Sequence, residues 1–382
     1  MNKKMRQTLT LTAILVCWAC DSEQQHVTVS PFGEPAQTSA LTTEAFRTYG
    51  EEMFDDDESF DEMTSSDRWF YLNDPFYARI ENAEMEVANF VAHDFNDVDI
   101  CMTMPQLNDT IILMHLDRVP GYYKSRIPSP LSSEDMLLAT RSGKTVRLTN
   151  AHLLSSSEYK VFPVCDDPVF ANVRKITMKT RIKWRVSNSG NWRPLTPEIT
   201  RYFAAMMLNV AACFSTPEFR EALLTYTSAD NPNDPFPPET CVHNDNGEAV
   251  DREKLLNTIL NKNELVCGDV WGYGGLGGGT TFGINMIYMG PASFFFRNRV
   301  DMSGVNGGSH LVIHELGHCV GMGHSSSMAG GYASIGHYIF PNVYKQLLKE
   351  GRLPYQMDPF KGSNDYNPGE SEDGNVDDDL VE

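Results

Sequence analysis

Residues 314–324 read His-Glu-Leu-Gly-His-Cys-Val-Gly-Met-Gly-His, and this stretch limits the fold and the chemistry of the chain more than any other. His314 and His318 are four residues apart, so on a helix both rings leave one face and can approach the same ion. Gly321 lets the chain leave the helix in a conformation that other residues resist, which carries His324 back toward that ion. The spacing therefore predicts a helix that bears a metal site with three imidazole ligands.

Glu315 adds a carboxylate next to the first of these ligands. It lies about 100° around the helix from His314, toward the side where water would sit. Three histidines leave the fourth position of a zinc ion open, and a carboxylate beside a water in that position can accept its proton. The residues therefore predict a metal-dependent hydrolase with Glu315 as general base. The alternative is an amphipathic helix with incidental histidines.

The stretch from His314 to His324 resembles the active-site motif of the metzincin clan of zinc endopeptidases. The resemblance is specific within the motif, weak in the residues that precede it and absent from residues 1–170. It implies that His314, His318 and His324 bind one catalytic Zn²⁺ ion and that Glu315 is the general base. It also implies that the substrate is a protein or a peptide.

Metzincins also place a methionine in a tight turn beneath the metal, and this chain departs from their spacing. Met328 follows the third histidine after four residues, and Met357 follows it after thirty-three. Met328 is the better candidate, because Ala329-Gly330-Gly331 supplies turn residues and residues 341–350 then read as a C-terminal helix. Met357, or neither residue, is the alternative. Tyr332 is a candidate contact to the metal or to a developing oxyanion, and a packed or surface tyrosine is the alternative.

His310 precedes His314 by one helical turn and lies on the same face. Successive turns advance about 5.4 Å, so His310 and His318 stand too far apart to share one tetrahedral ion. His310 is therefore interpreted as a residue behind the ligands or at the helix start. The other histidines lack ligand spacing and are interpreted as surface or core residues: His26, His93, His115, His152, His243 and His337.

The first 20 residues have the pattern of an export signal. Lys3, Lys4 and Arg6 precede an apolar run from Leu9 to Ala19, which is too short for a stable membrane anchor. Cys20 would suit lipoprotein processing, in which it becomes the acylated first residue and attaches the protein to a membrane. Ordinary signal cleavage and free secretion are the alternative. The sequence thus predicts an exported protein.

The chain is acidic, with 51 Asp and Glu against 31 Lys and Arg and a formal charge of −20. This balance argues against nucleic acid as a partner and against electrostatic docking on anionic membranes. Much of the charge lies in residues 51–62 and 362–382, which are interpreted as solvated and disordered segments. A calcium loop is disfavoured in both, because neither has the required ligand spacing.

Six cysteines follow the predicted signal, and an even number in an exported protein suggests disulfides. Fifteen pairings are combinatorially open to six cysteines. The preferred set is Cys101 with Cys165, Cys241 with Cys267, and Cys213 with Cys319. Cys319 follows a ligand histidine but points off the ligand face, so it is interpreted as a packing or bridging residue.

The chain is predicted to be α+β, with a metzincin-like zinc-peptidase domain preceded by a small β-rich region. Short apolar runs such as Thr110–Met114 and Thr145–Leu148, separated by turn clusters, favour strands in that region. It is interpreted as an accessory domain, and a pro-segment is the alternative. The predicted segments are a signal at 1–20, an acidic linker at 21–66, the β-rich region at 67–170, the catalytic domain at 171–351 and an acidic tail at 352–382.

Patterns of apolar residues predict the elements of the catalytic domain before the motif. Alternation from Lys175 to Val186 predicts a strand, and helices are predicted from Pro197 to Cys213 and at 217–226 and 251–261. The glycine-rich run 272–279 lacks the Lys-Ser/Thr ending of phosphate loops, so it is interpreted as a flexible loop beside the cleft.

The strand Phe282–Tyr288 is expected to lie above the zinc, where an extended substrate would pair with its edge. The predicted function is a zinc-dependent endopeptidase. A zinc amidase or non-peptide hydrolase that uses the same centre is one alternative. A surface-anchored binding protein with a vestigial zinc site is the other, although the intact Glu315 disfavours it.

Overall fold

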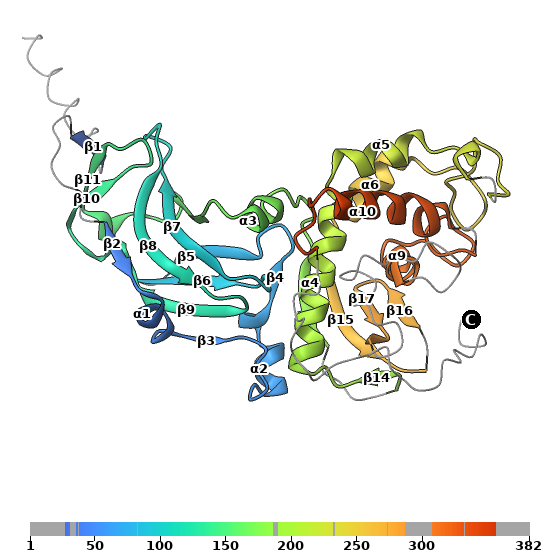
Figure 1. Cartoon of the computed structure of the whole chain (residues 1–382), viewed down its shortest axis with the longest axis horizontal. Helices are drawn as coiled ribbons and strands as arrows, with labels where there is room; N and C mark the ends of the chain where they lie inside the picture. Colours follow the sequence, from blue (N-terminus) through green and yellow to red (C-terminus); the bar gives the residue numbers. More distant parts are fainter. Residues whose placement is uncertain are drawn as a thin grey trace, which may run out of the picture.

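The computed structural model describes residues 27–30, 36, 38–81, 83–185, 190–231, 234–272, 274–286, 308–331 and 333–356. Within these ranges the chain has a mixed α+β fold with four open sheets, in agreement with the predicted class. Figure 1 shows three of the sheets on the left and the fourth, with most of the helices, on the right. We call the left part the β lobe and the right part the helical lobe.

The β lobe contains two sheets of four strands and one of three, and their strands pair antiparallel except for β2 with β8. In β11, buried Val146 and Leu148 alternate with exposed Arg147, as expected for a strand with one face on the core. The strands, in sheet order, are β1 (Val27–Ser30), β11 (Thr145–Thr149) and β10 (Asp135–Ala139); β12 (Lys160–Val164), β7 (Phe95–Thr103), β8 (Ile111–Val119) and β2 (Ser39–Leu41); β3 (Gly50–Glu52), β9 (Tyr123–Pro128), β6 (Glu84–Asn89) and β5 (Phe76–Glu81).

The sheet of the helical lobe has a parallel centre, β13–β15–β17, and antiparallel outer strands. The glycine-rich strand β16 forms one end of the sheet, and β4, from the N-terminal half of the chain, forms the other. The strands in order are β16 (Gly275–Gly278), β17 (Thr281–Ile284), β15 (Glu264–Val270), β13 (Arg181–Trp184) and β4 (Phe70–Tyr71), with β14 (Trp192–Arg193) paired to β15.

Helices begin where a capping residue precedes proline or an acidic first turn. Thr196 and Thr216 each cap a helix that starts with proline, and their hydroxyls accept the amides of Ile199 and Phe219 at 3.2 Å. The helices are α1 (Thr43–Arg47), α2 (Phe60–Thr64), α3 (Pro168–Val173), α4 (Pro197–Phe214), α5 (Pro217–Thr225), α6 (Arg252–Leu260), α9 (Gly308–Cys319) and α10 (Phe340–Lys349). Shorter turns are η1 (Ser66–Arg68), η2 (Pro130–Ser132), η3 (Ala151–Leu153), η4 (Ser228–Asp230) and the π-helix η5 (Ser334–Ile339).

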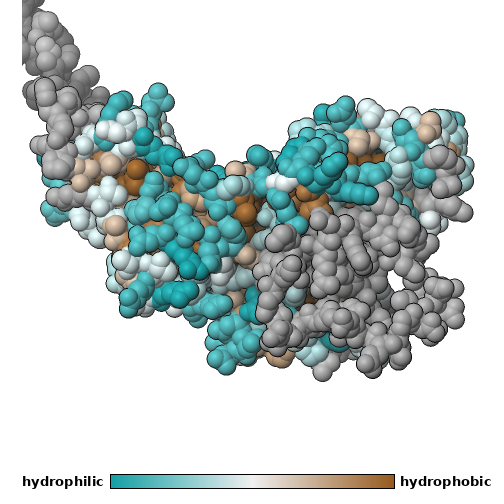
Figure 2. Space-filling model, viewed as in Figure 1, coloured by the Kyte–Doolittle hydropathy of each residue, from teal (hydrophilic) through white to brown (hydrophobic). Residues whose placement is uncertain are grey.

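One hydrophobic core runs through both lobes, and a second, smaller cluster of buried residues lies within the β lobe. Trp184 of β13 makes edge contacts with Phe54, at 5.6 Å between ring centroids, and tilted contacts with Phe70 at 6.2 Å. Its indole nitrogen donates to the carbonyl of Arg68 at 3.1 Å, and Tyr122 donates to the carbonyl of Arg201 at 2.7 Å. Figure 2 shows mostly hydrophilic residues over the coloured surface of the β lobe. Because Phe54 and Phe70 pack on Trp184, apolar residues of the N-terminal half complete the core of the helical lobe.

The acidic stretch 51–62 is a correction to the sequence analysis, which predicted a disordered linker there. Met53 and Phe54 within it are fully buried, and α2 begins inside it with a Ser59–Glu62 capping box. Two of the acidic side chains also have a cationic partner in the nearly buried Arg68. The prediction failed because a count of charges overlooked the two apolar anchors between them. The predicted acidic tail at 362–382 lies outside the described residues.

The cysteines are the second correction, because all six between Cys101 and Cys319 are free and the preferred disulfide set is not formed. Cys101 faces Phe162 across β7 and β12, and Cys165 lies three residues further along. That separation is about 10 Å along a strand, beyond the reach of a disulfide. The thiols of Cys241 and Cys319 instead donate to the carbonyls of Pro238, at 3.1 Å, and Thr281, at 2.9 Å.

The predicted export signal and Cys20 lie outside the described residues, so export and lipidation stay predictions. Across the described ranges, no helix combines the length and the apolar character that a membrane crossing requires.

Candidate metal centre

Helix α9 carries the first part of the motif and packs against β16, β17, η5 and α10. Its stripe Leu311, Glu315 and Cys319 faces the sheet: added side chains at Gly274 and Gly275 would meet Leu311 and Glu315. Leu316 and Ile313 are fully buried. His314 and His318 share a face that lies about 100° around the helix from this stripe.

His314, His318 and His324 come together as predicted and form a group that could hold a metal ion. One ligand atom from each ring lies within 4.8 Å of the other two. The Nε2 atoms of His314 and His318 are 3.1 Å apart, and a tetrahedral zinc site would place two nitrogens about 3.3 Å apart. Two of the rings are partly buried and His324 is exposed, so an ion in this group would be open to solvent on one side.

The exit from α9 follows the predicted route and also orients a ligand. Gly321 has a φ of 85°, in the left-handed region, and Met322 donates its amide to the carbonyl of Gly317 at 2.9 Å. The carbonyl of Met322 lies 2.8 Å from Nδ1 of His318. A carbonyl can only accept, so Nδ1 of His318 carries the proton and Nε2 presents its lone pair toward His314.

The electrostatics of the group suit a cation. Burial, together with the neighbouring rings of His318 and His324, lowers the pKa of His314 to about 4, and burial lowers the pKa of His318. Both rings are therefore neutral at pH 7, the form that binds a metal. Burial raises the pKa of Glu315 to about 8. A divalent cation close by would favour the ionised carboxylate, so the donor set and the buried acid both fit a metal ion.

Part of the glycine-rich run, Gly275–Gly278, is the strand β16, where a flexible loop was predicted. β16 pairs with β17 and lies directly on α9, and a Cβ atom at Gly277 would fall 2.3 Å from the carbonyl oxygen of Glu315. Only glycine allows strand and helix to approach so closely. The strand predicted to offer its edge to substrate, β17, is therefore paired on both sides, and β16 ends the sheet among the described residues.

Lys262, two residues after the end of α6, contacts both the ligand helix and the β16–β17 turn. Its ammonium donates to the carbonyl of Cys319, at 2.7 Å, and to that of Gly279, at 2.5 Å. The first of these carbonyls belongs to the last turn of α9, and the second to the turn between β16 and β17. A cation is favourable at a helix C-terminus, so Lys262 ties the ligand helix to the strand pair beside it.

Met328 is fully buried beneath α9, and an added Cβ at Gly317 would come within 2.8 Å of the Met328 Cβ. Gly317 lies between the first two ligands in sequence. Tyr332 and Met357, the other candidates, lie outside the described residues.

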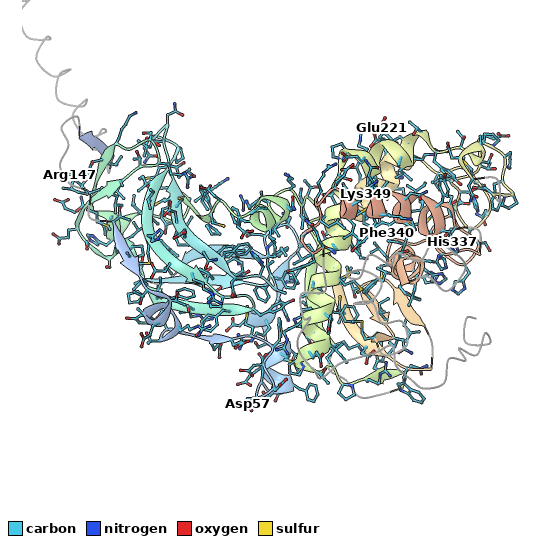
Figure 3. All side chains as sticks on the ribbon, viewed as in Figure 1. Asp57, Arg147, Glu221, His337, Phe340 and Lys349 are labelled. Carbon is cyan, nitrogen blue, oxygen red and sulfur yellow. The ribbon has the colours of Figure 1, made fainter. Side chains whose placement is uncertain are left out.

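His310 stays outside the ligand group, as predicted from the helical rise. Its ring stacks on that of His337 in η5, with centroids 3.6 Å apart. Figure 3 shows His337 beside α9, on the side of the helical lobe away from the β lobe. Burial and the neighbouring His337 lower the pKa of His310 to about 2, so the pair is neutral and packs as a core contact.

A loop at residues 240–248 was missed by the sequence analysis. The carboxylate of Asp245 accepts the amides of Gly323, at 2.6 Å, and Ser325, at 3.1 Å, on either side of His324. His243 is buried, and its Nε2 lies 3.1 Å from the carbonyl of Ser325. These residues precede the third ligand by about 80 positions, and no local spacing pointed to them.

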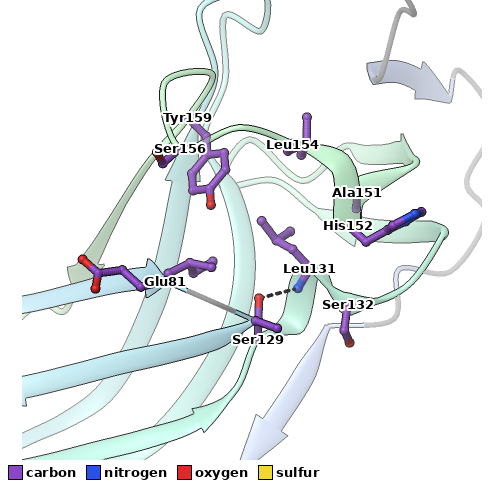
Figure 4. Close-up of a pocket in the computed structure, with 11 residues that line it drawn as sticks. Glu81, Ser129, Leu131, Ser132, Ala151, His152, Leu154, Ser156 and Tyr159 are labelled. Atoms are coloured by element: carbon purple, nitrogen blue, oxygen red, sulfur yellow. Dashed lines mark hydrogen bonds between the residues drawn. The ribbon is translucent and has the colours of Figure 1, made fainter.

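A cavity of about 470 Å³ lies in the β lobe. Figure 4 shows Tyr159, His152 and Leu154 around it, with the Ser129 hydroxyl accepting the Leu131 amide at 3.2 Å. None of the ligand histidines lines this cavity. In comparisons with protein-family models, curated protein sequences and solved structures, nothing matches the chain.

Proposed function

We propose that this protein is a zinc-dependent endopeptidase, with His314, His318 and His324 as the zinc ligands and Glu315 as the general base. The observation that carries the proposal is the convergence of three imidazoles, two of them held neutral, beside a buried carboxyl one residue away. The resemblance of residues 314–324 to the metzincin motif supports peptide bonds as the target. Met328, buried against Gly317, is proposed as the methionine of the turn beneath the metal.

Zinc, when bound, would supply a Lewis acid and lower the pKa of a coordinated water. The protein supplies the positions and the proton transfers. The proton on Nδ1 of His318 is held by the Met322 carbonyl, which leaves Nε2 for the metal. Glu315, once ionised beside a cation, takes a proton from the attacking water and returns it to the departing amine nitrogen. The backbone of β16 fixes the place of the Glu315 side chain.

An extended peptide is the substrate form that this site would accept. β16 runs along α9 beside Glu315, and the sheet ends there among the described residues. Main-chain groups of a substrate could pair with such an edge, as in other cases of strand addition.

The β lobe is proposed to be an accessory part and not a removable metal-blocking segment. Cys101 is fully buried, and burial raises the pKa of its thiol to about 11, so it stays protonated near neutral pH. Burial also raises the pKa of Cys165. In Figure 1, α4 stands between the strands of the β lobe and α9. Cys101, in β7, and Cys165, directly after β12, belong to the β lobe, on the other side of α4 from the ligand helix, and this position supports an accessory part.

The test is hydrolysis of a casein-like substrate by the full chain, with and without a chelator, alongside Glu315→Gln. We expect the chelator to abolish activity, and Glu315→Gln to lower it by about 10² to 10⁴ while zinc is retained. Glu248→Gln, an exposed carboxylate in the loop at 240–248, is the matched control and should stay active. Activity that survives both the chelator and Glu315→Gln would refute zinc catalysis. A folded, zinc-loaded protein that cleaves no peptide would refute the endopeptidase assignment.

A further inference from the structure

The third ligand, His324, lies in an exposed loop, in contrast to the two ligands on α9. Its ring lies against those of His314 and His318, with centroids 5.2 Å and 4.7 Å away. The backbone of the loop is held by the residues on either side of His324: the amides of Gly323 and Ser325 both donate to the one carboxylate of Asp245. These two hydrogen bonds hold peptide units 322–323 and 324–325, and so restrict the backbone from which the His324 side chain extends.

The sequence around His324 is adapted to this carboxylate. A Cβ at Gly323 would lie 2.5 Å from Oδ1 of Asp245 and 2.9 Å from its Cγ and Oδ2 atoms. The φ of Gly323 is not in the left-handed region, so the backbone there is compatible with alanine. The added methyl group would instead come too close to the Asp245 carboxylate. Glycine at this position therefore serves the contact with Asp245.

The loop that carries Asp245 is itself anchored beneath the ligand loop. His243 accepts the Ser327 amide on its carbonyl at 3.1 Å and donates its own amide to the Ser327 hydroxyl at 2.8 Å. The carbonyl of Cys241 accepts the Ser334 hydroxyl at 2.7 Å. Asp245 thus extends from a loop that is already fixed to the segment after His324.

We propose that Asp245 is a positioning residue for the metal: by holding the amides of Gly323 and Ser325, it sets His324 in the binding geometry and raises the affinity of the site. The inference rests on the metal site of the proposed function. Hydrogen bonds from amides to a carboxylate are charge-assisted, and a negative charge close to the ligands also favours a cation. Groups that orient ligands in this way typically change metal affinity by about 10-fold to 100-fold. Because Asp245 is exposed to solvent, we expect its loss to change the zinc affinity by about tenfold, the lower end of this range.

The experiment measures the zinc affinity of the full chain by competition with a chromophoric chelator, together with the visible absorption of the Co²⁺-loaded protein. Asp245→Ala should weaken zinc binding about tenfold and change the Co²⁺ spectrum. Asp245→Asn retains one acceptor oxygen and should have a smaller effect. Glu248→Ala removes the same charge from the same loop without touching residues 323–325, and its affinity should stay within about twofold of wild type.

Gly323→Ala offers an independent route to the same contact, since it displaces the carboxylate without removing it. It should weaken binding as much as Asp245→Ala does, and the double variant should be no weaker than either alone. Additive effects, an unchanged affinity in Asp245→Ala, or an equal loss in Glu248→Ala would overturn the proposal. Thermal unfolding of the metal-free variants checks that the fold is kept. If Asp245→Ala fails to fold, Gly323→Ala decides.

The same titration separates this inference from the proposed function. A wild-type protein that binds no zinc would overturn both. A wild-type protein that binds zinc but cleaves no peptide would overturn the endopeptidase alone, and the affinities of the variants would still decide the role of Asp245.

Discussion

At the scale of single residues, the contact between β16 and α9 depends on the absence of a side chain at Gly277. Its Cβ would lie 2.3 Å from the carbonyl oxygen of Glu315, a backbone atom inside a helix that cannot move aside. Gly277→Ala should therefore push β16 away from α9, destabilise the protein by about 1–3 kcal/mol and lower hydrolytic activity through the displaced Glu315. Urea unfolding and substrate cleavage measure the two effects.

Gly331→Ala is the matched control for Gly277→Ala. An added Cβ at Gly331 would meet nothing within 4 Å, so its stability should stay within about 0.5 kcal/mol of wild type. Equal stability of the two variants would contradict the close approach of strand and helix.

Residues close in sequence could be predicted, whereas partners far along the chain could not. His314, His318 and His324 converge because helical periodicity and one glycine act over eleven residues. Asp245 and Lys262 support the same site through contacts to backbone groups, which any residue offers and no motif records.

At the scale of elements, helices were predicted more accurately than strands. The predicted helices at 197–213 and 251–261 correspond to α4 and α6 within one residue at each end, because caps and apolar periodicity are local signals. β16 is mostly glycine, which has low strand propensity, and its position comes from pairing with β17 and packing on α9. Context, not composition, made it a strand.

The strand pair β6 and β9 carries a pH-dependent contribution to stability. Buried Lys124 lies 3.1 Å from Glu86. Burial alone would raise the pKa of Glu86, but the charge of Lys124 and hydrogen bonds from Tyr77, Lys124 and Arg126 outweigh it, so the pKa is lowered. A carboxyl whose pKa is depressed on folding stabilises the protein above its unfolded pKa, and this contribution is lost as the pH falls through its folded pKa.

Glu86→Gln should therefore lower the free energy of unfolding by about 1–3 kcal/mol at pH 7, and the difference from wild type should shrink as the pH falls below about 4.5. Urea unfolding of both proteins at a series of pH values from 7 down to about 3 measures it. Glu84→Gln changes an exposed carboxylate on the same strand and is the control. A difference that grows toward low pH would contradict the assignment.

At the scale of the whole molecule, the two lobes share a core. β4, from residues 70 and 71, closes the sheet of the helical lobe, and the acidic stretch before it inserts Phe54 among Phe90, Tyr122 and Trp184. The amide of Ala92, in the β lobe, donates to the hydroxyl oxygen of Tyr355, near the C-terminal end of the described chain, at 2.6 Å. Contacts from residues 54 and 70–71 and from the C-terminal Tyr355 therefore hold the lobes together, and we expect the two lobes to unfold as one unit.

Phe54→Ala tests this expectation, because Phe54 is fully buried at the junction and contacts side chains from both lobes. The lost packing should cost about 3–5 kcal/mol and lower the unfolding temperature in a single calorimetric transition. Phe60→Ala removes the same side chain from the same acidic stretch, but Phe60 is 44% exposed, so its cost should be below about 1 kcal/mol. Two separate transitions, with only one shifted by Phe54→Ala, would mean that the lobes fold independently. In that case the N-terminal lobe could be removed without unfolding the helical lobe. One shared transition would instead mean that removal of the N-terminal lobe exposes the core residues that pack on Trp184.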